Sequence, residues 1–301
     1  MKHNLKILTI LLLMFIIAQF IGLFVGFHYS QNPLPYGMQT PEIQNPDEYY
    51  SFLPSIIFSF ILAIMLLFLL SRIKTEFILK TWFFIVTIIA LGISILIFTN
   101  QLFFEKFFFG IPILATTISI IFSYLKIFQR NFIFHNLTEL LIYPGIATVF
   151  IPLLNIWTLV LILILISIYD IWAVWHSGIT QKMAKFQIQK LGIFAGFFVP
   201  YLNKNLRTKV KKMSKKDLKK GIKVNIAILG GGDVVFPIIA SGVVLRTFGS
   251  IPALGVIIGA TCGLLYLFLF SEKKKFYPAM PYITAGILLG LGIGIFTRSL
   301  F

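Results

Sequence analysis

Long apolar segments constrain this chain more than any other feature of its sequence. About nine segments of roughly twenty mostly apolar residues follow one another, and a segment of that kind can cross a bilayer. Only 12% of the residues are charged, about half the usual fraction in a soluble domain. We therefore predict an all-α polytopic membrane protein with nine transmembrane helices. The predicted spans are 7–27, 52–71, 77–99, 108–125, 133–152, 154–176, 224–245, 251–270 and 278–297.

The distribution of basic residues predicts the orientation of these spans. The net charge is +16, which in a soluble protein would suggest a nucleic-acid partner. Here, with the N-terminus placed inside, all Lys and Arg residues except Lys106, Arg246 and Arg298 fall on the inside, as the positive-inside rule requires. We therefore predict an inside N-terminus, an outside C-terminus and anionic lipid headgroups as partners, with no nucleic acid.

The composition divides the chain into three parts. Residues 1–176 form a six-helix part with bulky side chains, 177–222 form a basic inside loop, and 223–301 form a three-helix part rich in glycine. Within the loop, 183–201 mixes lysine with aromatic residues and is expected to lie in the membrane interface or over a cavity mouth. The Lys-rich stretch 203–220 is expected to be solvated near anionic lipid. Three glycines spaced four apart predict a helix-packing face: Gly255, Gly259 and Gly263.

The sequence offers few of the residues from which metal and redox sites are built. Cys262 is the one cysteine, so a disulfide within the chain is excluded, and the sequence has no Cys/His spacing of the metal-binding kind. We predict no metal and no cofactor. The first span is longer than the apolar region of most signal peptides and lacks an obvious cleavage site, which favours an uncleaved helix.

Three carboxylates lie inside predicted spans, where an ionisable residue costs a few kcal/mol and is a functional candidate. Glu139 lies about two turns into the fifth span, beside His135 and Asn136, and a local polar contact or snorkelling explains it better than chemistry. Asp170 lies near the end of the sixth span, and Asp233 lies in the seventh. Because these two spans are consecutive and antiparallel, we expect the two aspartates at similar depth.

Two carboxyl groups a few ångströms apart share a proton, so that one activates water while the other protonates a carbonyl oxygen. This is the chemistry of an aspartic protease. The glycines before Asp233, Gly230, Gly231 and Gly232, remove side-chain bulk where water and substrate would approach. A third feature is Pro278-Ala279-Met280-Pro281 at the start of the last span, which resists regular helix and is expected to offer main-chain groups to an extended substrate.

Together these motifs resemble the presenilin and signal-peptide-peptidase family of intramembrane aspartyl proteases. The family has Tyr-Asp in helix six, Gly-x-Gly-Asp in helix seven and Pro-Ala-Leu at the start of helix nine. This sequence has Tyr169-Asp170, Gly230-Gly231-Gly232-Asp233 and Pro278-Ala279-Met280, in that order. The departure is Met280 in place of leucine, a close match in volume.

The resemblance implies an aspartic endopeptidase that cleaves single-span membrane helices, with Asp170 and Asp233 as the catalytic pair. With the loop between helices six and seven inside, the substrates would have their N-termini outside. The short loops suggest a minimal microbial homologue, archaeal in type and located in the cell membrane. The alternative is an ion-coupled transporter or channel, because intramembrane carboxylates also mark ion paths. The sequence determines neither the oligomeric state nor self-cleavage in the inside loop.

Overall fold

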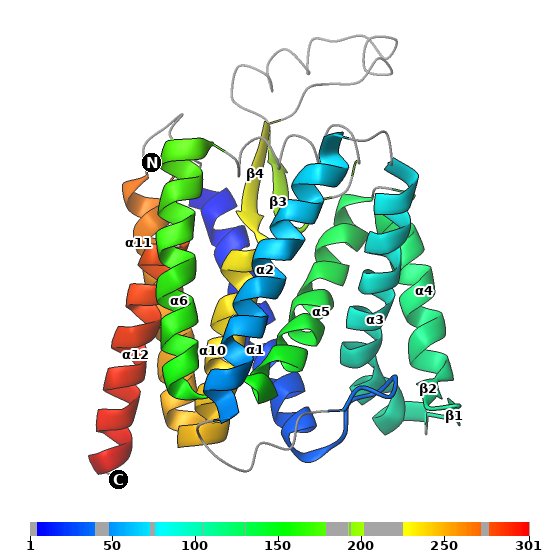
Figure 1. The fold of residues 1–301 in the computed structure, drawn as a ribbon, viewed down its shortest axis with the longest axis horizontal. Helices are drawn as coiled ribbons and strands as arrows, with labels where there is room; N and C mark the ends of the chain where they lie inside the picture. The colour runs from blue at the N-terminus through cyan, green and yellow to red at the C-terminus, as the bar shows by residue number, and fades with distance from the viewer. Residues whose placement is uncertain are drawn as a thin grey trace.

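The chain forms a bundle of helices with two short antiparallel hairpins (Figure 1). The structure is a computed structural model that describes residues 5–39, 48–72, 76–103, 105–129, 131–178, 192, 194–201, 225–271 and 277–300. Its helices are α1 (Leu5–Gln31), α2 (Glu48–Arg72), α3 (Glu76–Phe103), α4 (Ile113–Ile127), α5 (Phe132–Phe150), α6 (Ile156–Ile171), α10 (Gly231–Phe248), α11 (Ser250–Phe270) and α12 (Met280–Leu300). Its strands are β1 (Phe107–Phe108), β2 (Ile111–Pro112), β3 (Gly196–Tyr201) and β4 (Asn225–Gly230).

Among the described residues, seven helical segments are long and apolar enough to cross a membrane: Lys6–Gln31, Phe77–Phe103, Phe132–Leu153, Ile156–His176, Gly231–Phe248, Ser250–Phe270 and Met280–Leu300. Helices α2 and α4 lie where the second and fourth spans were predicted, and α4 has 15 residues. The predicted class is thereby confirmed in its coarse form: the described chain is mostly helical, with several apolar helices able to span a membrane.

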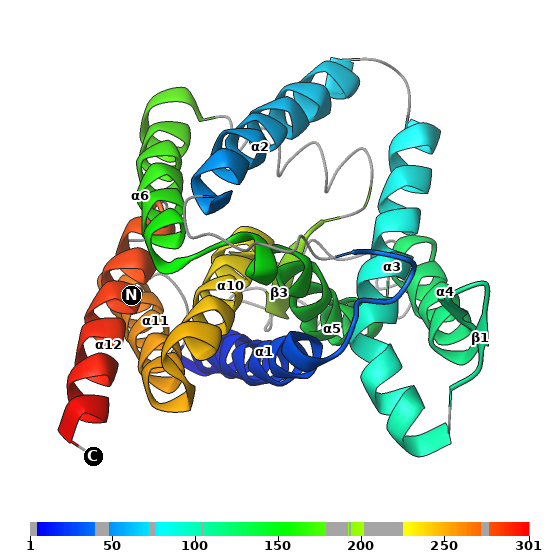
Figure 2. The ribbon, with the colours of Figure 1, turned by 60° about the horizontal axis from the view of Figure 1, so that its bottom comes forward.

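The two ends of the bundle differ in what they carry. The start of α1 and the β3–β4 hairpin lie at one end, and the end of α12 lies at the other with the β1–β2 hairpin (Figure 1). Helix α2 lies at the periphery, where it contacts α6 (Figure 2). The three-part division of the chain stays a prediction, and most of the basic loop lies outside the described residues.

The predicted seventh helix begins later than expected. Instead of a helix from residue 224, the chain forms β4 over Asn225–Gly230, and α10 starts at Gly231. Strand β4 pairs antiparallel with β3, Gly196 opposite Gly230 and Tyr201 opposite Asn225. A short apolar run of this kind suits a strand as well as a helix, and here pairing with β3 decides between them.

Strand β3 forms the end of the segment 183–201, which was expected to lie in the membrane interface or over a cavity mouth. Gly196–Tyr201 is strand, and the Phe197 side chain is fully buried, with its ring 5.3 Å from that of Tyr143 on α5 in an edge-to-face contact. The remaining residues of 183–193, apart from Gly192, lie outside the described part of the chain. The hairpin therefore belongs to the protein core at the point where α10 begins.

The glycines of α11 form the predicted packing face. A Cβ on Gly259 would lie 2.8 Å from the carbonyl carbon of Gly286 and 3.0 Å from the Cα of Gly290, both on α12. Gly255 and Gly263 face α12 backbone in the same way. Helices α11 and α12 therefore approach to backbone contact, which fixes the position of the start of α12.

Candidate active site

Asp170 lies in the last turn of α6, and its carboxyl group meets the start of α12. Helix α6 begins with a capping box in which Asn155 and Thr158 exchange side-chain and backbone hydrogen bonds, and beyond Ile171 it continues as a π-helix, Trp172–Ser177. The Met280 N–H donates to Asp170 Oδ2 at 3.0 Å, and the Ala279 N–H also interacts with this carboxyl group. The first N–H groups of a helix lack intrahelical acceptors, and a carboxylate is favoured there.

Asp233 lies in the first turn of α10, three residues after the N-cap Gly230. Its carboxyl group turns back toward the Gly230 N–H, in the manner of the second half of a capping box. Pro237 has no N–H to donate to the Asp233 carbonyl, so the helix is weakened directly behind this residue. Both aspartates therefore lie at helix N-termini: Asp233 at that of its own helix, Asp170 at that of α12.

The two carboxyl groups are close enough to interact electrostatically. Asp170 and Asp233 are both half-buried residues. The predicted antiparallel arrangement is present: α6 runs toward the hairpin end of the bundle, and α10 begins where β4 ends and runs away from that end (Figure 1). The arrangement offers one carboxyl group to abstract a proton and a second to donate one.

The three glycines before Asp233 differ in their surroundings. A Cβ on Gly230 would lie 3.1 Å from Asp233 Oδ2, and one on Gly231 would lie 3.0 to 3.2 Å from Tyr143 and from the Ala195 carbonyl oxygen. A Cβ on Gly232 would meet only Phe236, at 3.8 Å. Close approach of neighbours therefore requires glycine at the first two positions, whereas Gly232 leaves open space next to Asp233.

The Pro278–Pro281 segment is non-helical only in its first half. Pro278 and Ala279 precede the helix, while Met280 and Pro281 are already in the first turn of α12, where proline is tolerated because its missing N–H has no intrahelical role. Met280 is 3% exposed. Tyr169 is 38% exposed, and its ring centroid lies 6.3 Å from that of Trp172.

Four buried polar side chains near the aspartates carry no motif signal in the sequence. Ser167 donates to Thr284 Oγ1 at 2.9 Å, which joins α6 to α12 one turn from Asp170 and Met280. Gln19 on α1 donates to the Val234 carbonyl oxygen at 3.1 Å. Tyr143 on α5 packs beside Gly231. Only a structure shows that they surround the site, because they come from four helices distant in sequence.

Within the described ranges, no group of three or more His, Cys, Asp or Glu side chains is placed to hold a metal ion. An apolar cavity of about 570 Å³ lies between α2 and α6, lined by Tyr50, Leu53 and the Trp157–Leu165 face of α6. None of the candidate site residues lines it.

The similarities to known proteins agree with this geometry. The family model described as signal-peptide peptidase, presenilin aspartyl protease matches residues 12–300. The chain belongs to this family. It is an intramembrane aspartyl protease, and this membership favours the protease over the transporter or channel alternative. No curated protein matches the chain.

Two solved structures of a presenilin family intramembrane aspartate protease share the fold. The one in space group C222 has a TM-score of 0.60 and 17% identity, over 98% of this chain and 99% of that one. The one in space group P2 has a TM-score of 0.57 and 16% identity, over 97% of each chain. The archaeal-type family architecture thus extends over nearly the whole length.

Proposed function

We propose that Asp170 and Asp233 are the catalytic pair of this protease. The observation that carries the proposal is the arrangement of the carboxyl groups of two half-buried residues within electrostatic range of each other, each at the N-terminus of a helix. One carboxylate takes a proton from a water molecule, whose oxygen attacks the carbonyl carbon of the scissile bond. The other, protonated, donates its proton to the carbonyl oxygen. Proton transfer to the amide nitrogen then breaks the peptide bond.

The Pro278–Pro281 segment acts in this scheme through its backbone. The amides of Ala279 and Met280 are directed at Asp170, so they orient the carboxyl group and are not available to a substrate. The contact uses the N–H of residue 280 and not its side chain, so methionine serves as well as leucine. Substrate pairing, expected for this segment from the sequence, is better assigned to β4, which ends three residues before Asp233.

We further propose nine membrane spans, with the N-terminus inside and the C-terminus outside. Helices α2 and α4 supply the two spans beyond the seven long apolar segments. The placement of the start of α1 and the hairpin at one end, and of the end of α12 at the other, supports this topology (Figure 1). The substrates are then single-span helices with outside N-termini, cleaved in the cell membrane, while anionic lipids contact the basic inside loop.

The proposal is tested by cleavage of a single-span helical reporter with the purified protein. Asp170→Asn and Asp233→Asn should each abolish cleavage, because one carboxyl group cannot act as base and acid together. Thermal unfolding of both variants controls for loss of the fold. Full cleavage by either variant, or ion flux into vesicles without cleavage, would contradict the proposal.

A further inference from the structure

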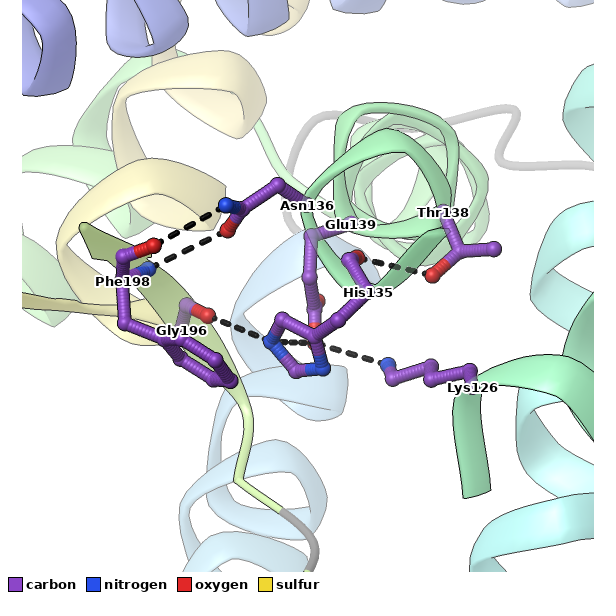
Figure 3. A network of polar contacts seen from close by, with 7 residues as sticks. All are labelled: Lys126, His135, Asn136, Thr138, Glu139, Gly196 and Phe198. Carbon is purple, nitrogen blue, oxygen red and sulfur yellow. Dashed lines mark hydrogen bonds and ion pairs between the residues drawn. The ribbon is translucent and has the colours of Figure 1, made fainter. Parts of the chain in front are cut away.

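The polar face of α5 contacts the backbone of β3 (Figure 3). Asn136 Nδ2 donates to the Phe198 carbonyl oxygen at 2.9 Å, and the Phe198 N–H donates to Asn136 Oδ1 at 3.1 Å. The His135 ring nitrogen Nε2 lies 2.8 Å from the Gly196 carbonyl oxygen, and its ring stacks on Phe198 with centroids 4.1 Å apart. A half-buried carboxamide thus bonds both backbone groups of a single strand residue.

This contact replaces a neighbouring strand. In an antiparallel pair, every second residue has its N–H and C=O groups pointing away from the partner strand, so the pair itself leaves these two groups without a hydrogen bond. Phe198 is such a residue, and its N–H and C=O groups point toward Asn136. A carboxamide has a donor and an acceptor at one end, so it matches these two groups at once. Asn136 therefore closes the outer edge of β3 at this residue.

Strand β3 is in turn joined to the start of α10. Phe198 is opposite Ile228 and Gly196 is opposite Gly230, the N-cap of α10. The Gly231 N–H donates to the Ala195 carbonyl oxygen at 3.0 Å. A displacement of β3 relative to α5 would therefore move the first turn of α10, and with it Asp233.

A buried ion pair holds the same stretch of α5 to α4. Lys126 Nζ lies 2.7 Å from Glu139 Oε1, and His135 Nε2 lies 3.5 Å from the same oxygen (Figure 3). Lys126 is 7% exposed and Glu139 is fully buried. The local polar contact expected for Glu139 is confirmed, and it fixes the helix from which Asn136 projects.

We propose that Asn136 is a positioning residue of the protease: by holding β3 through the backbone of Phe198, it sets the position of Asp233 relative to Asp170. This inference rests on the proposed function of the two aspartates. Asn136 has no direct role in the chemistry, so its loss should lower the rate of the chemical step more than substrate affinity.

The experiment compares Asn136→Ala, Asn136→Gln and Asn131→Ala in the full-length purified protein, with the single-span reporter. Asn131 is the matched control, because it is the N-cap of the same helix and accepts from the Ile133 N–H, without a contact to β3. Asn136→Ala should lower kcat by about tenfold to a hundredfold, since a 1 Å misplacement costs up to about a hundredfold. KM should rise by a smaller factor, because β4, the proposed substrate-pairing strand, is loosened at the same time. Asn136→Gln, which keeps donor and acceptor, should recover most of kcat.

Hydrogen exchange gives a readout that needs no protease activity. Asn136→Ala should speed exchange in 225–230, whereas Asn131→Ala should leave it unchanged. Unchanged kcat in Asn136→Ala, a fall in kcat that Asn131→Ala reproduces at equal loss of thermal stability, or no recovery in Asn136→Gln would overturn the proposal. If the exchange effect appears while Asp233→Asn cleaves normally, the proposed function fails and the positioning of α10 by Asn136 stands.

Discussion

Gly263→Ala is expected to damage the active site although Gly263 does not touch it. A Cβ at this position would lie 2.9 Å from the Tyr282 carbonyl carbon and nearer still to its oxygen, whereas ordinary contact begins at 3.4 Å. Backbone cannot rotate away as a flexible side chain can, so α11 and α12 must separate by about 1 Å, at a cost of about 1–3 kcal/mol. Tyr282 lies two residues after Met280, so this shift stretches the 3.0 Å hydrogen bond from the Met280 N–H to Asp170.

The expected result is a loss of kcat of up to about a hundredfold, the cost of a 1 Å misplacement of a reacting group. Two glycines serve as controls. Gly255→Ala overlaps the carbonyl oxygen of Gly290, ten residues from Met280, so it should lower the melting temperature comparably with a smaller loss of kcat. Gly292→Ala meets nothing within 4 Å and should be neutral. Wild-type kcat in Gly263→Ala, at a melting temperature as low as that of Gly255→Ala, would refute the coupling.

Three further predictions concern contacts around the site. Lys126→Met should destabilise the fold by about 3–5 kcal/mol, because it removes the Lys126 partner of the buried Glu139 carboxyl group. Lys126→Met/Glu139→Gln should recover most of this in thermal unfolding; equal losses would show that the pair carries no coupling. Gly231→Ala should lower the melting temperature more than Gly232→Ala, since only the former meets Tyr143 and Ala195 within 3.2 Å. Thr284→Val should lower kcat several-fold, because it removes the Ser167 hydrogen bond between α6 and α12. The free energy of unfolding should fall by about 1 kcal/mol. An unaltered reporter cleavage rate would show that this hydrogen bond does not position the site.

The sequence predicted the helices well because most of them are long apolar runs. Strand β4 was missed because Asn225–Gly230 continues into the apolar run of α10, and its partner β3 lies in a segment that mixes aromatic residues with lysine. Strand formation there depends on pairing across 23 intervening residues, from 202 to 224, and local pattern does not encode that pairing.

The candidate site was predicted in part for a similar reason. Asp170 and Asp233 are conspicuous because a carboxylate inside an apolar span is costly. The donor to Asp170 was not predictable, since it is a backbone N–H that residue 280 would offer with any side chain except proline. Asn136 also looked unremarkable, because its function depends on β3 lying beside α5, which only tertiary structure provides.

Backbone atoms are the target of the contacts that hold this site: Asp170 binds the Met280 amide, Asn136 binds both groups of Phe198, and Gln19 binds the Val234 carbonyl. A backbone group survives substitution of the residue that carries it. One partner in each contact is therefore free to change during evolution while the geometry stays the same. For protein engineering, it follows that substitutions of Met280, Phe198 or Val234 act through side-chain packing while these hydrogen bonds persist.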